Sequence, residues 1–252
     1  MTFDRALWTQ TLSKDFAPPW PCPSCVKGTL RLEPKTLSYR ETIASRRVHG
    51  DEDWDPTSVD YAFTAWLKCS EPSCGEGVAV AGTGGLEPVW DAEAGQGWEE
   101  FFMPRLLCPM PDMFTLPRKC PAQVVQALRS AFASSLHDPP AAAGKVRVAL
   151  ERLMDHVGVK KRRKGGNKVV DLSLHQRIQA FQVVEPDLGN QLMALKWLGN
   201  TGTHESAINR DDLLDAFEIL DHAVSELIDQ RSKRVAALAR RMIKKHARHR
   251  KP

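Results

Sequence analysis

The spacing of hydrophobic residues divides the chain into two regions of different texture. In the first, apolar and polar residues alternate over short runs. Alternation predicts strands, because successive side chains of a strand point to opposite faces. The predicted strands are TLRLEP at 29–34, TLSYRETIA at 36–44, DYAFTAWLKC at 60–69 and GVAVAG at 77–82. Residues 83–119 are rich in Gly, Pro and Trp, and we expect an irregular connector there.

From Pro121 onward, apolar residues recur every three or four positions, which predicts α-helices. Asp138 is a suitable N-cap, Pro139 suits the first helical position, and Gly158 suits the end of that helix. A stripe of apolar residues marks the last helix, which we expect to begin at Asn209 and to continue past Lys245. The predicted helices cover residues 122–136, 139–157, 172–181, 186–198 and 209–245. The stripe consists of Leu213, Phe217, Leu220, Val224 and Leu227.

This pattern predicts an α+β protein. A small β-rich N-terminal module with its connector would cover residues 1–103, an all-α helical bundle 104–230, and a basic helical tail 231–252. The chain has no run of 18 apolar residues, and its start, MTFDRALWTQTL, lacks the apolar core of a secretory signal. We therefore expect a cytoplasmic protein without a membrane span. In such a reducing compartment, paired cysteines more often bind metal than form disulfides.

Four of the six cysteines form two short pairs. CPSC places Cys22 and Cys25 three positions apart, and CSEPSC places Cys69 and Cys74 five positions apart. Each spacing lets two thiolates reach one zinc ion, and two such pairs complete a four-cysteine site. We expect a structural Zn²⁺ in a zinc-ribbon-like module, because four thiolates leave no coordination position open for a substrate. The alternative is four buried thiols that pack as small hydrophobic groups.

The net charge of +4 conceals an uneven distribution. Residues 231–252 contain ten Lys and Arg and no acid, whereas the other 230 residues carry 25 bases and 31 acids. A second basic cluster, KKRRKGGNK at 160–168, is predicted to be a loop. Cationic patches on an acidic body favour contact with the phosphate backbone of RNA or DNA. The candidate nucleic-acid-binding residues are Lys160, Lys161, Arg162, Arg163, Lys164, Arg240, Arg241, Lys244 and Lys245.

The helical half also resembles a known family. The similarity is carried by LPRKCPAQVVQALRSAF, VRVALERLMDHVGV, LSLHQRIQAF, ALKWLGNTGTHE and DDLLDAFEILDHAVSELID, over roughly residues 104–230. These segments resemble the domain-of-unknown-function 4145 family, which is related to the HEPN superfamily of helical nucleotide-binding domains. The resemblance implies a HEPN-like bundle and a homodimer formed through it. It also implies a bacterial phage-defence or mobile-element context, since relatives occur in restriction enzymes and toxins.

The turn LGNTGTHE at 198–205 allows two interpretations. HEPN ribonucleases carry an Arg, a polar residue after it, and a His four to six positions on, and two protomers bring these residues together. Asn200 and His204 match the polar residue and the His, but Gly199 stands where the Arg would be. Lys196, the nearest cation upstream, lacks the guanidinium fork. In the structural interpretation a glycine, Gly199 or Gly202, ends the helix and His204 caps or packs against the next one.

Three functions follow from these patterns. The first is a non-enzymatic or degenerate HEPN-like protein that dimerises and binds nucleic acid. The second is a metal-independent endoribonuclease that uses His204 and Asn200. This function needs an arginine within reach of His204, and the candidates are Arg147, Arg152 and Arg177.

The third function is that of a zinc-dependent adaptor that docks a larger defence enzyme. A docking module exposes apolar side chains for its partner. This function therefore predicts an exposed apolar patch among Trp54, Trp90 and Trp98.

Overall fold

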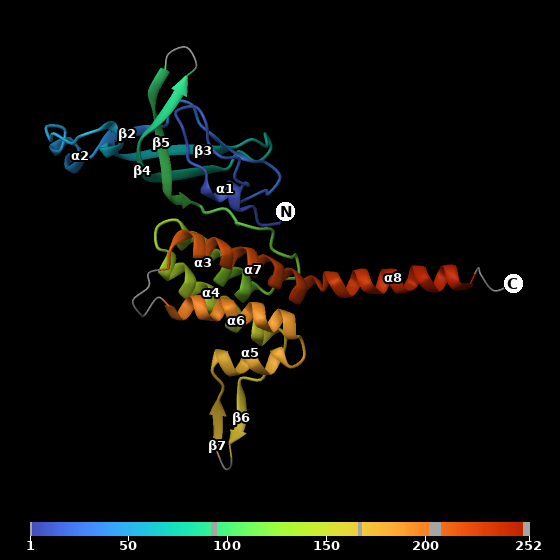
Figure 1. Ribbon diagram of the computed structural model, residues 1–252. Helices are drawn as coiled ribbons and strands as arrows, with labels where there is room; N and C mark the ends of the chain where they lie inside the picture. The colour runs from blue at the N-terminus through green and yellow to red at the C-terminus, as the bar shows by residue number, and fades with distance from the viewer. Residues whose placement is uncertain (1, 92–94, 166–167, 202–207, 249–252) are drawn as a thin grey trace. The chain divides into compact units, whose positions relative to one another are not determined.

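The computed structural model describes residues 2–91, 95–165, 168–201 and 208–248 and confirms a mixed α+β chain (Figure 1). The chain divides into two compact units. The sheet unit consists of Asp4–Met113 with Phe132–Asp138. The helical unit consists of Met1–Phe3, Phe114–Ala131 and Pro139–Pro252.

The sheet unit is built on one antiparallel sheet. Its strands are β1 (Leu30–Leu32), β2 (Ser38–Glu41), β3 (Asp60–Cys69), β4 (Gly77–Asp91) and β5 (Gly95–Cys108). The strand order is β1–β3–β4–β5, and β2 pairs with β3 beside β1. Strands therefore form in all four predicted runs, and β3 keeps the predicted bounds. Alternate residues of β3 are buried, as a sheet with one face on a core requires.

The predicted connector is wrong over residues 83–91 and 95–108, because they form most of the long strands β4 and β5. Gly and Pro usually weaken strands, and this composition hid the hairpin. In the fold, a Cβ on Gly84 would lie 2.4 Å from the carbonyl oxygen of Phe101, so glycine permits a close approach of the two strands. Pro104 pairs with Gly82 where the register shifts, a place at which a ladder tolerates proline.

Short helices and tryptophans complete the sheet unit. Helix α1 (Arg5–Thr9), helix α2 (Ile43–Arg47) and a 3₁₀ turn (Pro56–Ser58) lie outside the strands. The rings of Trp8 and Trp20 stack with centroids 6.2 Å apart, and both side chains are buried. Each indole N–H donates to a backbone carbonyl, that of Met113 for Trp8 and that of Leu7 for Trp20. Two large aromatic side chains are thereby buried without an unpaired donor.

The helical unit contains α3 (Ala122–Ser135, whose last residues count with the sheet unit), α4 (Pro139–His156), α5 (Leu174–Gln182), α6 (Pro186–Thr201), α7 (Arg210–Asp229) and α8 (Arg231–Arg248). The predicted stripe on α7 is confirmed, since Leu213, Phe217, Leu220 and Val224 are buried. The single long helix expected from Asn209 is wrong. It breaks at Gln230, which adopts a left-handed conformation with φ 47°. No described helix is both long and apolar enough to cross a bilayer.

The basic cluster at 160–168 is part of a hairpin and not of a loop. Strand β6 (Arg162–Gly165) pairs with β7 (Lys168–Asp171). The two residues between the strands in the sequence are Gly166 and Asn167, a pair of residue types favoured in tight hairpins. Charged residues on one strand concealed the alternation that normally predicts a strand.

Candidate metal centre and basic surfaces

The fold brings the two cysteine pairs together. Cys22 and Cys25 lie just before β1, Cys69 ends β3, and Cys74 precedes β4. Because β1 pairs with the end of β3, with Leu30 opposite Cys69, the two pairs meet at one end of the sheet. Their sulfur atoms all lie within 4.8 Å of one another. Among the described residues, this is the only group of His, Cys, Asp or Glu close enough to hold a metal ion.

The spacing of the sulfur atoms fits a tetrahedral ion. The Sγ atoms are 3.8 Å apart for Cys22 and Cys74 and 3.6 Å apart for Cys25 and Cys69. A tetrahedron with metal–sulfur bonds of about 2.3 Å has sulfur–sulfur edges of about 3.8 Å. A disulfide would place two sulfur atoms about 2.05 Å apart. The four cysteines can therefore hold one metal ion, and they are not cross-linked to each other.

Backbone geometry shapes both halves of the cluster. The residue after the second cysteine of each pair is left-handed, with φ 57° at Val26 and 67° at Gly75. The N–H of Gly28 donates to Cys25 Sγ and that of Glu71 to Cys69 Sγ, each at 3.4 Å. Such bonds orient thiolates toward an ion. Gly28 was not identified from the sequence, although a glycine three residues after Cys25 was a visible signal.

The thiols of the cluster differ in pKa. The hydrogen bond from Gly28 lowers the pKa of Cys25 to about 6. Burial raises the pKa of Cys69 to about 12. A bound cation favours the thiolate of every ligand, so binding of a metal to this cluster releases protons.

The basic hairpin, defined here as Lys160–Lys164 with Lys168, stands on the helical unit beside α5 (Figure 1). Lys161 binds Asp155 at 2.8 Å, and Arg162 binds Asp171 at 2.6 Å. In the described part of the chain, no carboxylate pairs with Arg163 or Lys164, and both side chains are exposed. The hairpin thus presents positive charge that the protein itself does not neutralise.

Helix α8 is the second basic surface. It contains eight Lys and Arg and no acid. Apart from Ala236, every residue from Arg231 to Lys245 is exposed. Lys233 pairs with Glu185 at 2.8 Å, whereas the four candidate residues further along have no carboxylate partner among the described residues. Those four are Arg240, Arg241, Lys244 and Lys245.

The predicted HEPN turn is only partly described. Asn200 lies within α6, and His204 lies outside the described residues. Gly199 is also inside α6, so it does not end that helix. Lys196 is buried, with Nζ 3.7 Å from the centroid of the Trp197 ring.

The three arginines considered as partners of His204 are all engaged by carboxylates. Arg177 is buried and donates to Asp155 at 2.7 Å. Arg152 lies 3.7 Å from the same carboxylate, and Arg147 lies 3.9 Å from Glu151. Each guanidinium therefore has a partner within the bundle, and Arg177 has the least freedom to serve elsewhere.

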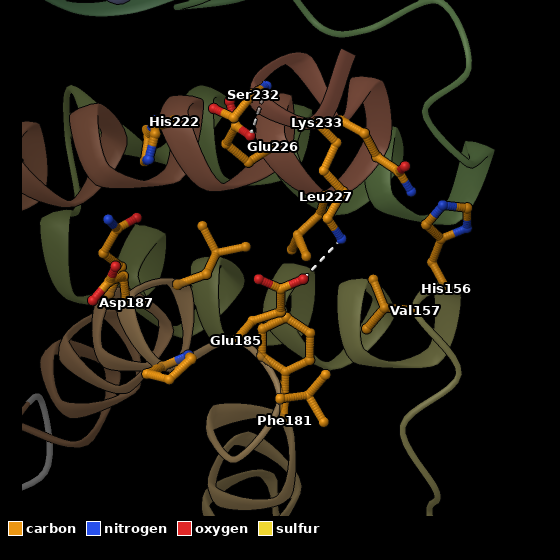
Figure 2. A pocket seen from close by; sticks show the side chains of 15 residues that line it. His156, Val157, Phe181, Glu185, Asp187, His222, Glu226, Leu227, Ser232 and Lys233 are labelled. Carbon is orange, nitrogen blue, oxygen red and sulfur yellow. Dashed lines mark hydrogen bonds and ion pairs between the residues drawn. The ribbon is translucent and has the colours of Figure 1, made fainter. Parts of the chain in front are cut away.

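A pocket of about 520 Å³ opens among α4, α6, α7 and the start of α8 (Figure 2). His156 and His222 line it, and the ion pair between Glu185 and Lys233 spans it. The ion pair fixes the first turn of α8 to the segment before α6. The ion pair across the pocket therefore links the start of α8 to its own bundle.

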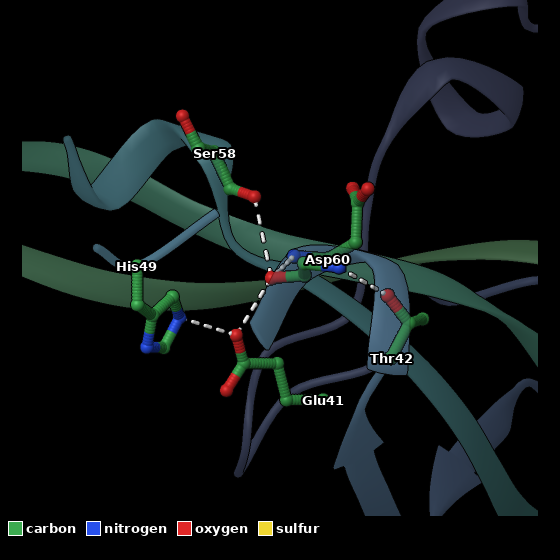
Figure 3. Close-up of polar contacts among 6 residues, drawn as sticks. Glu41, Thr42, His49, Ser58 and Asp60 are labelled. Carbon is green, nitrogen blue, oxygen red and sulfur yellow. Dashed lines mark hydrogen bonds and ion pairs between the residues drawn. The ribbon is translucent and has the colours of Figure 1, made fainter. Parts of the chain in front are cut away.

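A polar cluster in the sheet unit brings Ser45, His49 and Glu41 together, and Figure 3 labels the histidine and the glutamate. Ser45 Oγ donates to Glu41 at 2.6 Å, and His49 Nε2 lies 2.6 Å from the same oxygen. The bond from Ser45, followed by that from His49, lowers the pKa of Glu41. A catalytic triad needs the histidine between the other two. Here the glutamate lies between the serine and the histidine, so the cluster lacks the arrangement of a triad. Its hydrogen bonds join α2 to the sheet.

Comparison with known families agrees with this division of the chain. Residues 10–107 match the model of a family described as Domain of unknown function (DUF8608). Residues 129–246 match that described as Domain of unknown function (DUF4145), which supports the resemblance seen in the sequence. Searches of curated proteins and of solved structures found no match. The candidate metal centre lies in the region matched by the first model, and both basic surfaces lie mainly in the region matched by the second.

Proposed function

We propose that this protein binds nucleic acid through the phosphate backbone, using the basic hairpin and helix α8. The observation that carries the proposal is the set of exposed cations without carboxylate partners on these two elements. Neutralising phosphates releases condensed counterions, which drives binding without sequence recognition. The described side chains of both elements include no aromatic residue that could stack on bases. Binding should therefore depend weakly on sequence and strongly on salt.

We also propose that the metal is zinc and that its role is structural. Four thiolates are a ligand set that suits zinc, and they fill its coordination sphere. Zinc at this position would join the segment before β1 to the ends of β3 and β4. The sheet unit would then form a zinc-ribbon-like module. The resemblance alone supports a HEPN-like bundle that pairs two copies in bacterial antiviral defence.

The test is fluorescence anisotropy with labelled RNA and DNA, single- and double-stranded, over a series of salt concentrations. One variant carries Arg163→Gln with Lys164→Gln, and another carries Arg240→Gln with Arg241→Gln. The control is Arg46→Gln with Arg47→Gln, an exposed pair in α2 of the sheet unit with the same change of charge. Each test variant should lower the slope of log affinity against log salt by about 2, since each lost phosphate contact removes about 0.9.

Two outcomes would refute the proposal. One is no binding by the wild type at low salt. The other is a test variant that behaves like the control pair.

The ribonuclease alternative is examined in the same samples. Labelled RNA incubated in EDTA should stay intact in the wild type and in His204→Ala. Cleavage that disappears in His204→Ala would replace the binding function with catalysis at that histidine.

A further inference from the structure

The hairpin β4–β5 continues beyond the rest of its sheet. Strand β3 pairs with β4 only as far as Gly85, opposite Asp60. Among the described residues, Leu86–Asp91 of β4 and Gly95–Glu100 of β5 therefore pair only with each other. We call residues 86–91 and 95–100 the arm, and Figure 1 shows these parts of β4 and β5 extending past the other strands of the sheet unit.

The arm is acidic. Its described residues include four acids and no base. Glu87 lies directly opposite Glu99 in the register, and both side chains are exposed. Like charges at opposed positions destabilise a strand pair unless a cation lies nearby. Glu100 receives such a cation, Lys14 at 2.7 Å, whereas no base pairs with Glu87 or Glu99 in the described part of the chain.

One face of the arm carries exposed tryptophans. Residues opposite each other in an antiparallel pair share a face, so Trp90, Trp98 and Pro88 lie on the same side. Trp90 is 79% exposed and Trp98 is 37% exposed. Large aromatic side chains beside a polar rim are typical of binding surfaces. The arm thus has one apolar face, and Glu87 and Glu99 lie on its other face.

Helix α8 has the complementary character. Val235, Leu238 and Met242 follow the spacing of one helical face, and all three are exposed. At 100° per residue, Lys233, Arg240 and Lys244 fall on the opposite face. The polar contacts between the helix and its bundle in the described residues lie at its first turn, where Lys233 pairs with Glu185 and the N–H of Ser232 donates to Glu226. Its apolar stripe is therefore presented to other molecules.

Charge decides which surface can cover this stripe. Two α8 helices packed stripe to stripe would bring sixteen Lys and Arg together without one acid. The described residues of the arm include four acids and no base, so its net charge attracts α8, although Glu87 and Glu99 lie on the face opposite the tryptophans. The tryptophans can cover aliphatic side chains and lie against guanidinium groups. We propose that α8 of one copy docks on the tryptophan face of the arm of a second copy. Made reciprocally by two copies, this contact closes a dimer.

The test is sedimentation velocity of the full, metal-loaded chain without nucleic acid, over a range of protein concentrations. The arm variant is Trp90→Ser with Trp98→Ser, and its control is Trp66→Ser, a half-exposed tryptophan of β3 outside the arm. The helix variant is Leu238→Glu, and its control is Val183→Glu, which lies in the helical unit outside α8. Both test variants should raise the dimer dissociation constant at least about tenfold. The controls should match the wild type, and added salt should weaken the dimer.

A mixture of the two test variants identifies which copy supplies α8. The arm variant retains α8 and the helix variant retains the arm, so the mixture should form heterodimers with one intact contact. The proposal fails if the wild type is monomeric throughout. It also fails if both variants dimerise normally, or if the mixture does not associate, as a contact within one copy would require. Circular dichroism and metal content establish that each variant is folded.

Discussion

Replacing Gly28 with alanine should damage the metal centre although no ligand is changed. A Cβ at Gly28 would lie 2.5 Å from Cys69 Sγ and 2.8 Å from the backbone nitrogen of Glu71. Two non-bonded heavy atoms in ordinary contact lie at least about 3.4 Å apart, so the sulfur of Cys69 must move by about 0.9 Å to relieve the overlap. A metal–sulfur bond tolerates about 0.2 Å. We therefore expect metal affinity to fall at least about tenfold, which corresponds to about 1.4 kcal/mol.

The assay is competition for zinc with a chromogenic chelator, accompanied by metal analysis of the purified protein. Gly77→Ala is the matched control, because a Cβ there would meet only the ring of Trp66 at 3.7 Å. Wild type and Gly77→Ala should each hold one ion per chain with similar affinity. If Gly28→Ala binds zinc within twofold of the control, the geometry described for this cluster is wrong. If the wild type binds no metal under reducing conditions, the four-cysteine site itself is refuted.

Two further predictions concern stability. Val26→Gly should stabilise the sheet unit by about 1 kcal/mol, because a β-branched residue is strained at φ 57°, and thermal unfolding measures this. Around Asp155, burial raises the pKa, but hydrogen bonds from Lys161 and Arg177 lower it below its ordinary value overall. This contribution is therefore complete above the ordinary pKa of the carboxyl and is lost as pH falls through the lowered one. Asp155→Asn should cost roughly 3 kcal/mol at pH 7, because it leaves Arg177 buried without its counter-charge. The cost should shrink as pH falls through the lowered pKa of Asp155, and urea unfolding over a series of pH values measures it.

The elements that could be predicted from the sequence are those whose signal is local. The stripe on α7 and the alternation in β3 each report a single element with one buried face, and both agree with the structure. The hairpin β4–β5 could not be predicted in this way. Gly82 and Gly84 are needed there because rings and carbonyls of residues distant in the sequence occupy the space of a Cβ. The sequence near these glycines by itself resembles a loop. The break at Gln230 was missed because it lacks the glycine that usually occupies a left-handed C-cap.

The same distinction applies to the candidate sites. Cysteine spacing is a local signal, and it indicates all four members of the cluster that the fold brings together. The positions of the basic residues are also visible in the sequence, and their role in binding stays a prediction. Which of them are neutralised depends on Asp155 and Asp171, whose positions follow from the tertiary structure. The partners of Arg177 likewise could not be inferred, because α4 and α5 meet only in the folded bundle.

One property of the sequence underlies both proposed interactions. Residues 1–113 carry 17 acids and 10 bases, whereas residues 114–252 carry 14 acids and 25 bases. Opposite charge draws α8 toward phosphates and toward the arm alike, so salt alone cannot tell the two interactions apart. The two faces of α8 distinguish these interactions, because phosphate binding needs its cations and only docking on the arm needs its apolar stripe. Arg240→Gln with Arg241→Gln therefore weakens both interactions, while Leu238→Glu acts mainly on the dimer, and the proposals can fail independently.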